Sequence, residues 1–323
     1  MKLAMIGLGK MGANMVGRLR DAGHEVIGYD VNPGTRDVDT LEDMVAALEP
    51  PRVVWVMVPA GEPTQQTVVA LADLLKTGDI LVDGGNSRFT DDQDHAAMLD
   101  ERGIGFVDCG VSGGVWGREN GYGLMVGGSS EHVEQLLPIF EALRPPVIAD
   151  EPGAGYAHAG EVGAGHFAKM VHNGIEYGLM QAYAEGYELL AAADLVTDVP
   201  AVLMAWTQGT VIRSWLLDLL VRALEQDPEL ADIQGYVQDS GEGRWTVEEA
   251  IKHRVPMPVI SAALFARFAS RQDDSPAMQA VAALRNQFGG HATVGRDEHV
   301  EAPGSPEPPS RRTPPPPSAT EPS

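Results

Sequence analysis

The chain has 323 residues, of which 44% are hydrophobic, so it can bury a sizeable core and wholesale disorder is excluded. Its formal net charge is −23, which repels the phosphates of nucleic acids and anionic membranes, and we expect neither as a partner. The single cysteine, Cys109, cannot form an intramolecular disulfide, and no apolar run approaches the ~18 residues of a membrane span. We therefore expect a cytoplasmic protein without a secretory signal.

Residues 1–162 alternate short apolar runs with helical stretches. The runs are nearly continuous rather than alternating, as in strands that are buried on both faces. This order predicts an α/β domain, a Rossmann-type doubly wound parallel sheet. The predicted strands are Lys2–Ile6, Glu25–Tyr29, Val53–Val58, Ile80–Val82, Ile104–Val107 and Leu124–Val126.

Residues 163–291 lose the strand signal and predict an all-α domain, with a break between helices at Pro256 and Pro258. The predicted helices are His166–Ala193, Trp206–Leu224, Val259–Ser270 and Ala277–Phe288. Residues 292–323 hold 9 of the 23 prolines and almost no apolar bulk, which predicts a disordered tail. An inert extension is favoured for this tail over a ligand of a recognition domain.

A glycine-rich turn follows the first predicted strand and opens a helix. Gly7 permits a tight turn, Gly9 lets a pyrophosphate approach the backbone, and Gly12 allows close packing of helix on strand. The free N–H groups of the helix then face the phosphates. We assign nucleotide binding to this turn and to residues near it: Gly7, Leu8, Gly9, Lys10, Met11, Gly12, Asp30, Val58 and Asn86.

Asp30 lies at the end of the second predicted strand, 18 residues beyond Gly12. A carboxylate there accepts hydrogen bonds from a ribose 2′-hydroxyl and repels a 2′-phosphate, so NAD is favoured over NADP. Arg36 is the nearest cation that would accommodate NADP instead.

A polar stripe follows the long helix at helical spacing. At 100° per residue its members occupy one face of about 140°. The face mixes cations, an acid and a phenol, which favours a catalytic face over an ordinary solvated one. The stripe is Lys169, His172, Asn173, Glu176 and Tyr177.

Three motifs resemble the 6-phosphogluconate dehydrogenase family, within the β-hydroxyacid dehydrogenase superfamily, and the likeness covers almost all of residues 1–291. They are Asp83-Gly84-Gly85-Asn86-Ser87, Gly110-Val111-Ser112-Gly113-Gly114, and the run from Gly163 through Lys169 and His172-Asn173-Gly174-Ile175-Glu176-Tyr177 to Gly178. The resemblance is to the short, NAD-preferring form of this family. Its reaction oxidises and decarboxylates 6-phosphogluconate to ribulose 5-phosphate in the pentose phosphate pathway.

The resemblance implies that Lys169 is the general base and Glu176 the general acid. Lysine has an ordinary pKa near 10.4, so its role as a base requires a lowered pKa. The β-keto group that forms is its own electron sink, so no metal is expected. The implied substrate contacts are Asn86, Ser112, Gly113, Gly114, His172, Asn173, Tyr177, Arg267, Arg285 and His291.

Arg285 and His291 match a motif that reaches the active site of a neighbouring subunit, which implies a homo-oligomer, a dimer or a tetramer. Near Gly241 and Glu242 the chain lacks a segment that carries phosphate contacts in the long members. Two alternatives stay open: a β-hydroxyacid dehydrogenase that acts on a smaller or unphosphorylated acid, and a non-catalytic NAD-sensing protein.

Overall fold

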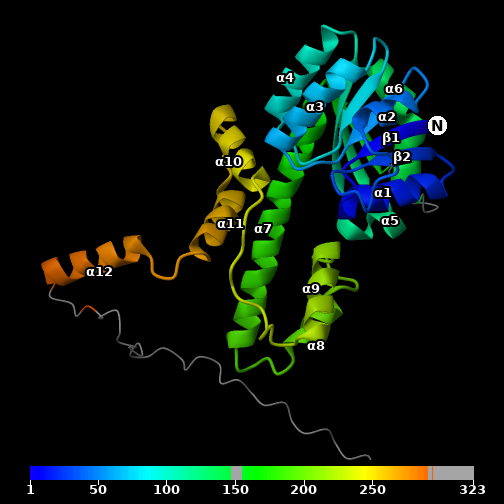
Figure 1. Ribbon diagram of the computed structural model, residues 1–323. Helices are drawn as coiled ribbons and strands as arrows, with labels where there is room; N and C mark the ends of the chain where they lie inside the picture. The colour runs from blue at the N-terminus through cyan, green and yellow to red at the C-terminus, as the bar shows by residue number, and fades with distance from the viewer. Residues whose placement is uncertain (147–154, 290–292, 294–323) are drawn as a thin grey trace, which may run out of the picture. The chain divides into compact units, whose positions relative to one another are not determined.

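The computed structural model describes residues 1–146, 155–289 and 293 (Figure 1). The chain divides into two compact units, Met1–Gly174 and Ile175–Ser323. The tail predicted for residues 292–323 lies outside the described residues, apart from residue 293. Among the described helices, none combines the length and apolar character needed to cross a membrane.

The first unit is built around a seven-stranded sheet with the order β2-β1-β3-β4-β5-β6-β7. The strands are β1 (Lys2–Ile6), β2 (Glu25–Tyr29), β3 (Val53–Val56), β4 (Ile80–Asp83), β5 (Gly105–Ser112), β6 (Gly123–Gly127) and β7 (Tyr156–Gly160). Strands β1 to β5 are parallel to one another, whereas β6 pairs with β5 in antiparallel fashion and β7 follows β6 in parallel. The predicted α/β fold is confirmed, but the sheet is mostly rather than wholly parallel.

Helices cover both faces of this sheet, and each face has its own apolar core (Figure 1). Side chains of α1 and α6 pack on one face, and those of α2, α3 and α4 pack on the other. The long helix α7 starts in this unit and ends in the second. The helical elements up to that point are α1 (Lys10–Asp21), α2 (Leu41–Ala46), α3 (Glu62–Leu74), α4 (Phe89–Asp100), η1 (Gly114–Trp116), α5 (Gly117–Asn120), α6 (Ser130–Leu143) and α7 (Ala164–Ala192).

The second unit is helical, as predicted. After the C-terminal part of α7 come α8 (Val199–Trp206), α9 (Trp215–Gln226), α10 (Glu242–His253), α11 (Pro258–Ala269) and α12 (Pro276–Gly289). Two small cores form on α7. One lies with α8 and α9 around Leu203 and Leu217, and the other with α10 and α11 around Tyr177 and Leu264.

The prediction of one helix over Trp206–Leu224 is wrong. Helix α8 ends at Trp206, Gly209 follows with φ of +70°, and α9 begins only at Trp215. The hydroxyl of Ser214 caps α9 by accepting a hydrogen bond from the N–H of Leu217 at 3.2 Å. The prediction failed because apolar residues recur at helical spacing on both sides of the break, which Gly209 and the N-cap residue Ser214 impose.

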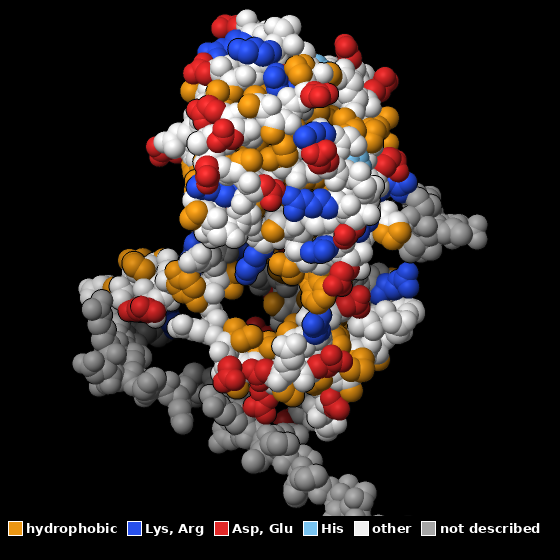
Figure 2. Space-filling model, turned by 45° about the vertical axis from the view of Figure 1, so that its right-hand side comes forward, with side chains coloured by type: hydrophobic (Ala, Val, Ile, Leu, Met, Phe, Trp, Pro, Cys, Tyr) orange, Lys and Arg blue, Asp and Glu red, His pale blue; other side chains and the backbone are white. Residues whose placement is uncertain are grey.

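Acidic and basic side chains are interspersed over the face of the molecule that Figure 2 shows, with hydrophobic side chains between them. The exposed apolar side chains include several on the helices of the second unit. On α12, Met278, Val281 and Leu284 are 61%, 45% and 64% exposed. A helix with such a surface is typical of an interaction face.

Candidate active site

One face of β5 sets the position of α7. Residues at alternate positions of a strand point to the same side, and Asp108, Gly110 and Ser112 share such a spacing. The carboxylate of Asp108 accepts the backbone N–H of Gly163 at 2.6 Å and that of His166 at 2.8 Å. Asp108 therefore satisfies free N–H groups at the start of α7 and places a negative charge at the positive end of the helix dipole.

Lys169 lies one turn further along α7, against Gly110. A β-carbon at Gly110 would lie 2.3 Å from the β-carbon of Lys169, so only glycine lets helix and strand approach this closely. Lys169 is 7% exposed. Burial of an amine disfavours its charged form, which is the physical requirement for a lysine that acts as a base.

The next turn of α7 carries His172 and Asn173 beside the end of β5. The hydroxyl of Ser112 lies 3.4 Å from Nε2 of His172, and Nδ1 of His172 lies 3.0 Å from Oδ1 of Asn173. Gly113 and Gly114 follow with φ of +141° and +54°. The structure thus brings together Lys169, Ser112, His172 and Asn173 over one face of β5.

Asn86 belongs to a loop that Asp83 organises at the end of β4. The Asp83 carboxylate accepts the N–H of Gly85 at 2.9 Å and the hydroxyl of Ser87 at 2.6 Å. Asp83 is buried, whereas Asn86 is exposed. Since Asp83 and Asp108 are paired residues of neighbouring parallel strands, the loop of Asn86 follows the strand beside β5.

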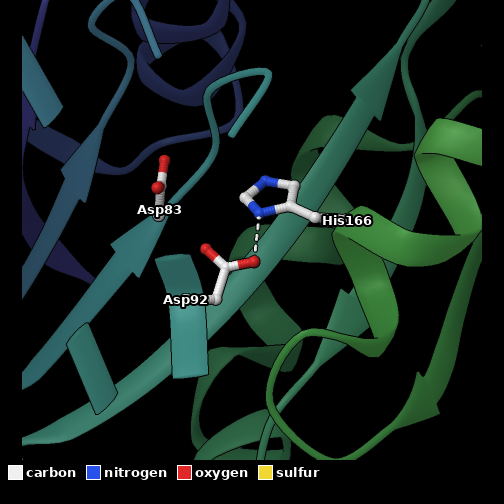
Figure 3. A group of neighbouring side chains, drawn as sticks. All are labelled: Asp83, Asp92 and His166. Carbon is white, nitrogen blue, oxygen red and sulfur yellow. Dashed lines mark hydrogen bonds and ion pairs between the residues drawn. The ribbon is translucent and has the colours of Figure 1, made fainter. Parts of the chain in front are cut away.

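A buried ion pair joins the first turn of α7 to α4 and was not predicted from the sequence. Nδ1 of His166 lies 2.7 Å from Oδ2 of Asp92, which comes from α4 (Figure 3). Asp83, Asp92 and His166 each place one polar atom within 4.8 Å of the others. His166 was expected only to start a helix, and no role was expected for Asp92.

Both pKa values of this pair are shifted upward, for different reasons. Burial, together with the charges of Asp83 and Asp108, raises the pKa of Asp92 to about 7 against the lowering effect of His166. Burial acts to lower the pKa of His166, but the charge and hydrogen bond of Asp92, together with Asp83 and Asp108, raise it to about 9. The negative charge of Asp92 therefore favours the imidazolium form of His166.

The glycine-rich turn lies where the strand order reverses, between β1 and β3, the place at which α/β sheets bind ligands. Gly7 has φ of +90°, and a β-carbon on it would lie 2.5 Å from the carbonyl oxygen of Met57, next to Val58. A β-carbon at Gly12 would lie 1.9 Å from the carbonyl oxygen of Gly7. Both glycines are therefore required by packing.

The space at Gly9 is open. A β-carbon there would have no neighbour within 4 Å among the described residues, and no described side chain caps the helix that begins at Lys10. The carboxylate of Asp30 accepts the N–H of Leu8 at 2.6 Å and that of Asn32 at 2.8 Å. Asp30 thus lies beside the turn, and this arrangement fits a dinucleotide.

The other predicted site residues belong to the second unit. Glu176 is half-buried on α7, seven residues beyond Lys169, so helix geometry puts it on the same face about two turns away. The hydroxyl of Tyr177 accepts the N–H of Ser240 at 3.2 Å, and the guanidinium of Arg267 lies 3.4 Å from the centre of the Tyr177 ring. Arg267 also donates a hydrogen bond to the carbonyl oxygen of Gln238 at 3.1 Å.

Arg285 is exposed on α12, and His291 lies outside the described residues. The placement of Arg285 in a site therefore stays a prediction.

A doubly wound sheet with a phosphate-binding turn, a following helical unit and a buried lysine on the joining helix define a nucleotide-dependent dehydrogenase. Residues 2–148 match the NAD binding domain of 6-phosphogluconate dehydrogenase, and residues 165–302 match the C-terminal domain of that enzyme. The chain belongs to the 6-phosphogluconate dehydrogenase family, as its motifs predicted.

Similar proteins agree with this assignment. A Haloferax volcanii protein named as an NAD+-dependent, decarboxylating 6-phosphogluconate dehydrogenase is 41% identical over 92% of this chain and 100% of its own length. A Bacillus subtilis protein of the same name is 35% identical over 83% of this chain and 61% of its own. The 6-phosphogluconate dehydrogenase structure from Plasmodium falciparum is 25% identical, with a TM-score of 0.76, over 93% of this chain and 67% of its own.

Proposed function

We propose that this protein oxidises and decarboxylates 6-phosphogluconate to ribulose 5-phosphate and CO2 with NAD as the cofactor. The observation that carries the proposal is the burial of Lys169 against Gly110, beside Ser112 and His172, in a chain that matches the family over residues 2–148 and 165–302. Such a site holds an amine out of water next to groups that bind hydroxyls.

In this reaction Lys169 takes the proton of the 3-hydroxyl. NAD, bound at the glycine-rich turn, supplies the acceptor for the hydride that leaves C3. Lys169 is then a cation beside the new C3 carbonyl and stabilises the negative charge that develops as CO2 departs. Glu176, on the same helical face, delivers a proton to C1 of the enediol. The carbonyl itself accepts the electrons, so the step requires no metal.

The substrate contacts follow from the placement of the polar groups. Asn86, Ser112, His172 and Asn173, with the backbone of Gly113 and Gly114, would hold the hydroxyls and the carboxylate. Tyr177 and Arg267 would bind the phosphate, Arg267 through those guanidinium N–H groups that do not contact Gln238.

NAD is favoured over NADP by Asp30, whose carboxylate stands at the turn and repels a 2′-phosphate. Arg36 is the cation that would accommodate the 2′-phosphate of NADP. Its Nη2 is bonded to Asp39 at 2.8 Å, so its charge is already paired, which also favours NAD. A single buried cysteine, Cys109, agrees with a reducing cytoplasm as the location.

We further place the functional domain boundary at residues 162–163 and propose a homo-oligomer, a dimer or a tetramer. The exposed apolar side chains of α12 support an interface there, and Arg285 on that helix, with His291 beyond it, would complete the site of a neighbouring subunit. Light scattering measures the mass directly. A monomer at assay concentrations that is fully active contradicts this part of the proposal.

The test of the function is turnover by the purified protein with 6-phosphogluconate and with 3-hydroxyisobutyrate, each with NAD and with NADP. We expect NADH and CO2 in equal amounts from 6-phosphogluconate. Turnover of 3-hydroxyisobutyrate alone would identify a dehydrogenase of smaller acids. Binding of NAD without turnover of either acid would identify a sensing protein.

A further inference from the structure

The cluster of Asp83, Asp92 and His166 is unusual because it buries three ionisable groups that the reaction does not use. Their exposed fractions are 0%, 0% and 2%. Asp108, also 0% exposed, contributes a further carboxylate nearby. Buried charges cost free energy unless they are paired, so a cluster of this kind needs a reason.

The cluster joins elements that carry the proposed site. Asp83 holds the loop of Asn86 from β4, Asp92 comes from α4, and His166 lies in the first turn of α7, three residues before Lys169 (Figure 3). An aromatic contact between Phe89 and Phe167, with ring centres 5.1 Å apart, runs alongside and joins the same two helices.

Asp108 and Asp92 constrain α7 in different ways. Asp108 binds the backbone N–H groups of Gly163 and His166, which anchors the start of the helix to β5. Asp92 binds the side chain of His166, which fixes the rotation of the first turn. Because Lys169 lies 300° further around the same helix, its direction follows from the rotation set at His166.

The two side chains of the pair rely on each other for hydrogen bonding. Oδ1 of Asp92 and Nε2 of His166 have no hydrogen-bond partner among the described residues. Each side chain therefore depends on the other for its hydrogen bond, and loss of either leaves the other buried and unpaired.

We infer that the Asp92–His166 ion pair is a positioning element of the active site, which sets the rotation of α7 and so the place of Lys169 beside β5. The inference rests on the proposed function, since that function assigns Lys169 as the base.

A divalent cation is the other chemistry that these side chains suggest. Against it, both oxygens of Asp83 accept hydrogen bonds from their own loop, and Asp92 and His166 are bonded directly to each other. The groups that would ligate a cation thus satisfy one another, and the ion pair accounts for their burial.

The test uses full-length Asp92→Asn, His166→Gln and the double variant, with Asp94→Asn as the matched control. Asp94 is an exposed acid of the same helix. We expect kcat to fall about 10-fold to 100-fold in each single variant, since a small misplacement of a catalytic group has this effect. The KM for NAD should stay within about twofold, because the nucleotide turn is not touched. The kcat of the double variant should fall no further than that of the less active single variant, since the two residues act as one unit.

The pH profile of kcat is a readout that a loss of stability alone would not change. Asp92→Asn removes the main anion beside His166, so the alkaline limb should move to lower pH, whereas Asp94→Asn should leave it in place. Equal profiles in all variants, or an activity that EDTA abolishes and Mn2+ restores, would overturn the inference.

Hydrogen–deuterium exchange separates this inference from the proposed function. If the wild-type protein does not turn over 6-phosphogluconate, the function fails but exchange still reports on α7. We expect Asp92→Asn, but not Asp94→Asn, to speed amide exchange in the peptide 163–173 and to spare α9. If Asp92→Asn does not fold, His166→Gln, which removes the other member of the pair, gives the same comparison. Unchanged exchange at 163–173 in a folded variant refutes the positioning role.

Discussion

Gly110 and Lys169 are in such close contact that strand β5 and helix α7 have no room for a side chain between them. A β-carbon on Gly110 would lie 2.3 Å from the β-carbon of Lys169 and 2.9 Å from its γ-carbon. The strand thus holds the lysine at the base of its side chain, and the residue as a whole is 7% exposed.

Gly110→Ala should therefore damage catalysis by displacing Lys169. We expect a loss of about 1–3 kcal/mol in the free energy of unfolding from overpacking, and a larger relative loss in kcat than in NAD affinity. Gly186→Ala is the matched control, because a β-carbon there has no neighbour within 4 Å among the described residues and the position lies in the same helix. That control should be neutral or stabilising by up to about 1 kcal/mol. Chemical unfolding and steady-state kinetics measure both, and an active, stable Gly110→Ala variant would show that α7 can shift without cost.

Lys169→Met removes the amine while keeping most of the side-chain length. We expect kcat to fall by about 10²-fold to 10⁴-fold, the usual contribution of a positioned general base. Calorimetry should give an unchanged Kd for NAD, because the nucleotide turn lies on other elements. Lys252→Met, on the exposed side of α10, is the control and should keep full activity. Residual kcat in Lys169→Met within about tenfold of wild type would assign the base to another group.

Asp30→Ala tests the choice of cofactor. The substitution removes the acceptor of the Leu8 and Asn32 N–H groups and the charge that repels a 2′-phosphate. We expect the ratio of kcat/KM for NAD to that for NADP to fall by about tenfold or more, since a charged hydrogen bond contributes roughly 1.5–3 kcal/mol. Asp30→Asn separates the two effects, because it keeps an acceptor and loses the charge. A ratio that neither variant changes would mean that another residue reads the ribose.

The strands were predictable from the sequence because the sheet is buried on both faces. The runs at Lys2–Ile6 and Glu25–Tyr29 were predicted with the bounds that the structure has. The edge strand Tyr156–Gly160 was not predicted, since most of its residues are small or polar and three of its five residues are exposed. An edge strand carries little of the apolar signal that identifies inner strands.

The candidate site was predictable only in part. Lys169, His172 and Asn173 recur at helical spacing and form a pattern within one element. Asp92 and His166 are 74 positions apart in the sequence, and an acid on a helix is usually exposed, so nothing local indicates their pairing. The only signal is a histidine one turn before a lysine, after glycines that allow close packing.

Stability should depend on pH through the same pair. The pKa of His166 in the folded protein, about 9, is above its ordinary value of 6.5. Its stabilising contribution is therefore fully present below about pH 6.5 and is lost as the pH rises through about 9. The raised pKa of Asp92, about 7, acts in the same direction at lower pH. We expect the free energy of unfolding to fall between pH 7 and 9 by up to about 1.4 kcal/mol per pH unit for the His166 proton. His166→Gln should flatten this dependence, and a wild-type protein that is as stable at pH 9 as at pH 7 would contradict the assignment.

Arg267→Lys tests the phosphate contact. The guanidinium carbon of Arg267 lies over the Tyr177 ring, 3.4 Å from its centre, and lysine cannot keep both this contact and the hydrogen bond to Gln238. If Arg267 binds the phosphate, KM for 6-phosphogluconate should rise by about tenfold or more while kcat stays within a few-fold. The reason is that a bidentate phosphate contact is lost equally from the bound substrate and from the transition state. Unphosphorylated gluconate gives the internal comparison, since its kcat/KM should hardly change. Arg213→Lys, an exposed arginine of the same unit, controls for the loss of guanidinium. An equal loss for both acids would mean that Arg267 supports Tyr177 and α11 and does not bind the phosphate.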